Sequence, residues 1–60
     1  MDDHTEAIGI YLLLIQETQS AMARLAALRE KGWDGRAISI AMTHIETAQL
    51  WATNAKPEAL

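Results

Sequence analysis

Six side chains in this sequence have the chemistry to contact a small anionic ligand: Tyr11, Arg24, Arg29, Thr43, His44 and Thr47. An aromatic ring can stack on a nucleobase, because every base has a π face. Guanidinium groups bind phosphate oxygens through paired N–H donors. Hydroxyl and imidazole groups could meet the phosphates or sugars of the same ligand. These residues are therefore candidates for binding.

Most of these residues also have an ordinary structural interpretation. Tyr11 lies in an apolar run, where a core or interface tyrosine with a satisfied hydroxyl is common. Thr43 and Thr47 lie four positions apart on one helical face, but helical threonines often bond to their own backbone. His44 as a general base is less convincing than a hydrogen-bonded structural histidine, because Glu46 points away from it on a helix.

Four of the five Lys and Arg residues lie toward the segment "GWDG" at positions 32–35. They are Arg24, Arg29, Lys31 and Arg36. One interpretation is that they favour solubility and complement a helix dipole. The other is that they form an anion site.

No segment carries the pattern of an enzyme. The sequence has no glycine-rich phosphate loop, no nucleophile elbow and no His-x-x-x-His pair. It has no cysteine, and its two histidines, His4 and His44, lie far apart. We therefore expect a protein without catalytic activity, metal or cofactor.

The chain is short, with 60 residues, of which 50% are hydrophobic and 22% charged. Domains of this size bury only about 60% of their unfolded surface, and small scaffolds usually need disulfides, a metal or oligomerisation. Without cysteine, oligomerisation is the remaining route. The net charge of −3 argues against binding to long nucleic acid.

The N-terminus and the longest apolar run indicate where in the cell the protein is expected to lie. Asp2 and Asp3 make the first residues acidic, where a secretory signal would be positive. The longest apolar run, residues 7–15, is far shorter than the ~20 residues of a membrane span. We expect a soluble, cytoplasmic protein with no membrane partner.

Helix start and stop signals predict one all-α domain, an antiparallel helical hairpin with a long first helix and a shorter second one. Gly32 follows a basic turn and is typical of a helix end. Asp34 is a good N-cap for the next helix, and Pro57 limits its continuation. Gly9 leaves open whether the first helix is interrupted. The predicted ranges are about 5–31 for the first helix, 32–35 for the turn, about 36–54 for the second helix and 55–60 for a frayed tail.

The two predicted helices differ in their apolar pattern. The second has one stripe, which comprises Ile38, Ala41, Ile45, Ala48 and Ala52. The first is apolar all round between residues 8 and 15, which is typical of a helix buried from several sides. One partner arm cannot cover such a helix, so we expect copies of the chain to form a homo-oligomeric helical bundle.

The second helix, "AISIAMTHIETAQLWATNA" at residues 37–55, resembles the closing helix of small phage proteins that sequester cyclic oligonucleotides. Those proteins block the bacterial immunity called CBASS, and relatives block the Thoeris pathway. The shared pattern covers about a third of the chain, after an alanine-bearing lead-in. Its residues are Thr43, a hydrophobic residue at Ile45, Glu46, Ala48, Trp51 and Ala52.

The resemblance implies helical hairpins that assemble into oligomers, commonly hexamers, and that hold cyclic dinucleotides without cleaving them. Some members also hold cyclic trinucleotides at separate sites. An early aromatic of the long helix stacks on a base, which here matches Tyr11. A later basic residue contacts phosphate, for which Arg24 is the nearest match and Arg29 the next. Trp51 and Ala52 are implied to maintain the hairpin and its interface. This chain departs from the pattern in having little or no separate N-terminal helix.

Helix geometry places a constraint on this site. Tyr11 and Arg24 are roughly 20 Å apart at 1.5 Å per residue, which is too far for one compact ligand. They would have to come from different, antiparallel subunits, with Thr43, Thr47 and His44 facing the same junction. The alternative function is a small oligomeric protein-interaction module that has no nucleotide ligand.

Overall fold

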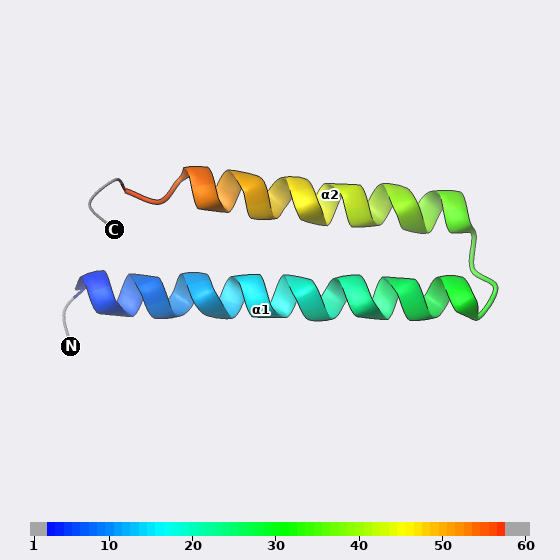
Figure 1. Cartoon of the computed structure of the whole chain (residues 1–60), viewed down its shortest axis with the longest axis horizontal. Helices are drawn as coiled ribbons and strands as arrows, with labels where there is room; N and C mark the ends of the chain where they lie inside the picture. The colour runs from blue at the N-terminus through cyan, green and yellow to red at the C-terminus, as the bar shows by residue number, and fades with distance from the viewer. Residues whose placement is uncertain (1–2, 58–60) are drawn as a thin grey trace.

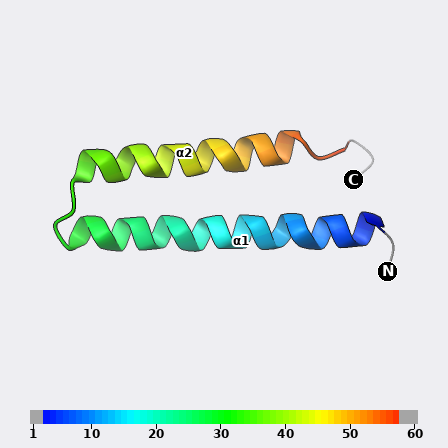
Figure 2. The ribbon, with the colours of Figure 1, turned by 180° about the vertical axis from the view of Figure 1, so that it is seen from behind.

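The protein is described by a computed structural model over residues 3–57, which form two antiparallel helices (Figure 1). Helix α1 spans Asp3–Glu30 and helix α2 spans Gly35–Asn54. They lie side by side, and the view from behind shows the same arrangement (Figure 2). The described residues contain no strand, so the predicted all-α helical hairpin is confirmed.

Helix α1 is long and continuous. It runs through Gly9 without a break, so this glycine does not divide the first helix. Met1 and Asp2 lie outside the described residues, as do positions 58–60 of the predicted tail. Neither helix of the described part is long and apolar enough to cross a membrane.

The end of α1 is closed by a Schellman motif, in which a residue with positive φ reverses the chain. Gly32 takes this role with φ 99°. The backbone N–H of Trp33 donates to the carbonyl of Leu28 at 3.2 Å, and that of Gly32 donates to Arg29 at 3.1 Å. These two bonds satisfy carbonyls that the helix end would otherwise leave unpaired.

The start of α2 is capped as predicted. The Asp34 carboxylate accepts a hydrogen bond from the backbone N–H of Arg36 at 3.0 Å, which satisfies one of the first free donors of the helix. Across the turn, the Arg29 guanidinium donates to the Ser39 hydroxyl at 3.2 Å. The turn therefore has a defined geometry, and it determines which residues of α2 lie opposite which residues of α1.

One stripe from each helix forms the contact between them. On α1 the main residues of this half-buried stripe are Ile8, Tyr11, Ile15, Thr18, Met22 and Leu25. On α2 they are Ile38, Ala41, Met42, Ile45, Gln49 and Ala52. Successive members along each stripe mostly follow steps of three and four, the spacing of a helix–helix seam. Among the described residues only Ile38 is fully buried, with 6% of its surface exposed.

The α2 stripe corrects one position of the predicted stripe. Ala48 is exposed, and Gln49 is half-buried in its place. The sequence favours Ala48 because it is apolar and lies three positions after Ile45. The structure places Gln49, four positions after Ile45, against α1, because its amide finds a partner there.

That partner is Thr18, and the two side chains form a polar layer within the apolar seam. The Gln49 Nε2 donates to Thr18 Oγ1 at 2.7 Å. The Thr18 hydroxyl in turn lies within hydrogen-bond distance of the carbonyls of Leu14 and Ile15, at 3.0 and 2.9 Å. A half-buried polar pair whose hydrogen bonds are made favours one register, because a slipped register leaves both groups unpaired.

The hairpin leaves much of its apolar surface uncovered. On α1 the exposed large side chains are Ile10, Leu12, Leu13 and Leu14. On the turn and α2 they are Trp33, Ile40, Leu50 and Trp51. The second helix covers only one side of α1, as expected for a helix that is apolar all round.

The polar layer can be tested by a double-mutant cycle on Thr18→Val and Gln49→Leu. We expect each single change to lower the free energy of unfolding by about 1 kcal/mol, because each removes one partner of a half-buried hydrogen bond. We expect the double variant to recover that loss, since replacing both partners by apolar groups is nearly neutral. Urea denaturation measures all four proteins. Strictly additive effects would contradict a coupled layer.

Substitutions at two glycines provide a second test, because they are expected to change the stability in opposite directions. A Cβ at Gly9 would meet nothing within 4 Å, so Gly9→Ala should raise the stability by about 0.5–1 kcal/mol through helix propensity. Gly32 has φ 99°, so Gly32→Ala should lower the stability by about 1–2 kcal/mol. Urea midpoints report both. A destabilising Gly9→Ala would mean that another chain lies against this position.

Candidate functional site

Tyr11 lies on the face of α1 that meets α2, near the end of the hairpin away from the turn. Its hydroxyl is 2.8 Å from Oγ1 of Thr53. The single hydroxyl proton of Thr53 is directed to the carbonyl of Gln49 at 2.9 Å. Tyr11 is therefore the donor in the contact with Thr53, and this bond fixes the orientation of its ring.

A cation covers one face of the Tyr11 ring. The Lys56 Nζ lies 4.8 Å from the ring centroid, which is within the range of a cation–π contact. At an exposed site such a contact contributes about 0.5–1 kcal/mol. Lys56 follows the C-cap Ala55, so it extends the reach of α2 toward the start of α1.

Sequence reasoning missed both Thr53 and Lys56 as neighbours of Tyr11. A signal was available, because residues at equal distances from the turn face each other in an antiparallel hairpin. Lys56 and Tyr11 are equally far from the centre of the turn, as are Gln49 and Thr18. A cation just beyond the end of a helix is also favoured by the helix dipole.

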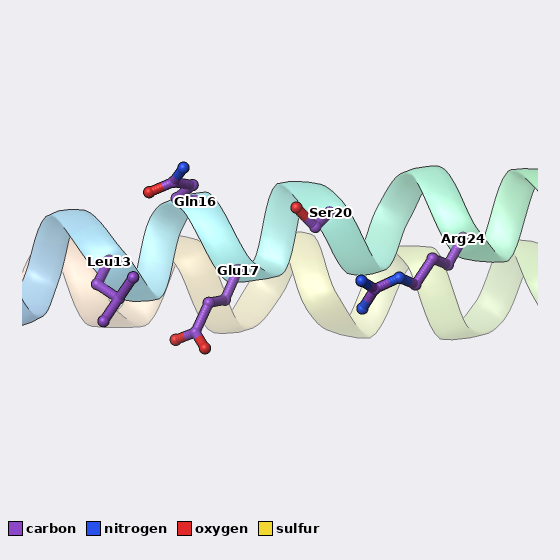
Figure 3. Close-up of a pocket in the computed structure, with 5 residues that line it drawn as sticks. All are labelled: Leu13, Gln16, Glu17, Ser20 and Arg24. Carbon is purple, nitrogen blue, oxygen red and sulfur yellow. The ribbon is translucent and has the colours of Figure 1, made fainter.

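Arg24 lies on a different, exposed face of α1. Together with Leu13, Gln16, Glu17 and Ser20 it lines a shallow, open depression of about 330 Å³ (Figure 3). All five side chains come from α1, and the arginine and glutamate provide opposite charges on the same face. This face is an open surface of one helix, so a ligand held there needs further contacts from another chain.

Tyr11 and Arg24 do not meet within one chain. At 100° per residue they are separated by roughly 140° around the axis of α1, in addition to about 20 Å along it. Tyr11 is half-buried against α2, whereas Arg24 is exposed. A ligand that contacts both residues must therefore lie between two chains.

Arg29 is engaged at the turn. Its Nη1 donates to Ser39, and its Cδ lies 3.6 Å from the position of a Cβ added at Gly35. Lys31 and Arg36 are exposed nearby. Arg29 keeps other N–H donors for an anion, but it lies in the last turn of α1, far along the helix from Tyr11.

The predicted threonines of α2 bond to their own helix. Thr43 donates to the carbonyl of Ser39 at 3.0 Å, and Thr47 donates to the carbonyl of Thr43 at 2.9 Å. Each hydroxyl therefore offers only acceptor lone pairs, which do not favour a phosphate oxygen. His44 is exposed on α2, and its neighbour Ile45 lies in the seam.

Trp51 corrects another expectation. It does not anchor the hairpin within one chain, because 66% of its surface is exposed. Ala52, its neighbour, lies half-buried in the seam instead. Adjacent residues of a helix face different directions, so Trp51 lies largely outside the seam that Ala52 enters.

The described residues include no group of three or more His, Asp or Glu side chains that could hold a metal ion. Comparisons of the chain with protein-family models, curated proteins and solved structures find no match. The geometry of the chain itself therefore carries the functional argument, together with the sequence pattern of its second helix.

The hydroxyl bond of Tyr11 can be tested with Tyr11→Phe. We expect the free energy of unfolding to fall by about 0.5–1.5 kcal/mol, because one hydrogen bond between the helices is lost. Thr53→Val should give a similar loss, and the two changes combined should cost less than their sum. Chemical denaturation measures the three variants. An unchanged stability in Tyr11→Phe would rule out this bond in solution.

Proposed function

We propose that the protein is a non-enzymatic, homo-oligomeric helical hairpin that binds cyclic oligonucleotides between its subunits and so sequesters them. Cyclic dinucleotides are the primary ligand class, and trinucleotides are a further one. The proposed role is to block CBASS-type immunity from a phage, which places its action in the cytoplasm of the host bacterium. The support is the resemblance of residues 37–55 to phage sequestering proteins together with the geometry of the hairpin.

The observation that carries the proposal is the exposure of Trp51. The indole belongs to the resembling pattern, yet most of the surface of Trp51 is exposed in one chain. Exposed aromatic residues are enriched in protein–protein interfaces, and a contiguous exposed apolar surface usually marks one. We therefore infer that another protein chain covers Trp51, which would then stabilise the interface between the two chains.

Copies of the same chain are the proposed partner. Helix α1 exposes Leu12, Leu13 and Leu14, and one second helix cannot cover them. A chain of this length without disulfides gains stability by burying such surface in an oligomer. The resembling family commonly forms hexamers, and we propose the same assembly here.

An oligomer also supplies the missing half of the site. Tyr11 of one chain and Arg24 of another would lie close together if two α1 helices packed antiparallel. Stacking on an aromatic ring contributes about 1–3 kcal/mol per base, and a guanidinium binds a phosphate through two N–H donors. Because a cyclic dinucleotide has only two phosphates, a net acidic protein can bind it with few cations.

The proposal can be tested by thermal unfolding with a panel of cyclic di- and trinucleotides. Ligand at ~100 times its dissociation constant adds about 2.7 kcal/mol to the folded state, so a clear rise in melting temperature is expected. The ligand recovered after denaturation should be intact, because no cleavage is proposed. Light scattering on the free protein should give a mass several times that of one chain.

Matched variants make this test specific. Tyr11→Ala and Arg24→Ala should each weaken binding at least tenfold, while Gln19→Ala serves as an exposed control on α1. A monomeric protein, or no stabilisation by any member of the panel, would contradict the proposal. In that case the exposed leucines favour a protein-interaction module, which a defined partner polypeptide bound at fixed stoichiometry would establish.

A further inference from the structure

The contact between Lys56 and Tyr11 places a positive charge against an aromatic ring. The ammonium lies 4.8 Å from the ring centroid. The backbone N–H of Lys56 donates to the carbonyl of Thr53 at 3.2 Å, so the start of the side chain is attached to the last turn of α2. The ring itself is fixed by its hydroxyl bond to the same threonine.

Lys56 has no competing partner among the described residues. Within residues 3–57, the contact with Tyr11 is the only polar, ionic or ring interaction of its side chain, and no carboxylate of these residues lies within ion-pair distance. An exposed cation–π contact is weaker than the stacking of a nucleobase on an aromatic ring. A base that reached this ring face would therefore be favoured over the ammonium.

We propose that Lys56 is a ligand-binding residue that covers the Tyr11 ring in the free protein and pairs with a ligand phosphate once a base has replaced it. This inference rests on the proposed function, and it names a phosphate partner within the same chain as the stacking ring. The ligand class is a nucleotide whose phosphodiester lies beside its stacked base. The resembling helix pattern ends at position 55, so it does not include this residue.

A lysine that the ligand displaces from the Tyr11 ring would meet two requirements of such a site. The aromatic face stays covered when no ligand is present, which reduces apolar exposure beside the seam. The ammonium then moves only a short way, because its backbone remains attached to α2. Its attraction for a phosphate persists in water, where opposite charges at 4 Å still interact appreciably.

The test compares wild type, Lys56→Met and Lys56→Arg, since methionine keeps the aliphatic stem and removes the charge. The probes are 3′,3′-cyclic di-AMP and 3′,3′-cyclic di-GMP, with adenosine and guanosine as phosphate-free counterparts. Calorimetry should show the cyclic dinucleotides binding about three- to tenfold more weakly to Lys56→Met than to wild type. The nucleosides should bind Lys56→Met as well as, or better than, wild type, because the cover is gone. Lys56→Arg should restore the cyclic dinucleotide affinity.

Nuclear magnetic resonance provides an independent readout of the free protein. The ε-methylene protons of Lys56 should be shifted upfield by the Tyr11 ring current, and that shift should disappear when a cyclic dinucleotide binds. Equal affinity of wild type and Lys56→Met for the cyclic dinucleotides would overturn the role of Lys56 and leave the proposed function intact. Failure of wild type to bind either cyclic dinucleotide would overturn both.

Discussion

The register of α2 against α1 is the constraint on which the other features of this hairpin depend. The positive φ of Gly32 and the cap at Asp34 determine where α2 begins. The hydrogen bond from Gln49 to Thr18 then favours one alignment of the two helices. In that alignment the end of α2 lies beside Tyr11, so the surroundings of the ring follow from a turn at the other end of the molecule.

A second helix can cover only one side of the first, and this limit explains the surface of the protein. Leu12, Leu13 and Leu14 stay exposed because α2 lies against another face of α1. The periodicity of α1 places Tyr11 and Arg24 on different faces of the same helix. Assembly of several chains, as proposed, would cover the leucines and bring these two side chains together, so stability and ligand binding would have one cause.

The use of hydroxyl protons determines which side chains remain available to an anion. Thr43, Thr47 and Thr53 each direct their proton to a carbonyl of their own helix. The oxygen atoms that remain are acceptors, and Thr53 already accepts from Tyr11. Cationic side chains, among them Arg24, Arg29 and Lys56, are consequently the donors available to the proposed ligand.

The sequence by itself determined the two helices, the turn between them and the incomplete burial of α1, because propensity, capping and periodicity are local properties. It also identified Tyr11 and Arg24 as chemically suitable residues. Only the tertiary structure decided that Gln49 replaces Ala48 in the seam, that Trp51 points outward, and that Lys56 covers Tyr11. Those outcomes depend on the register and on the close approach of two helices, which relate residues far apart in the sequence.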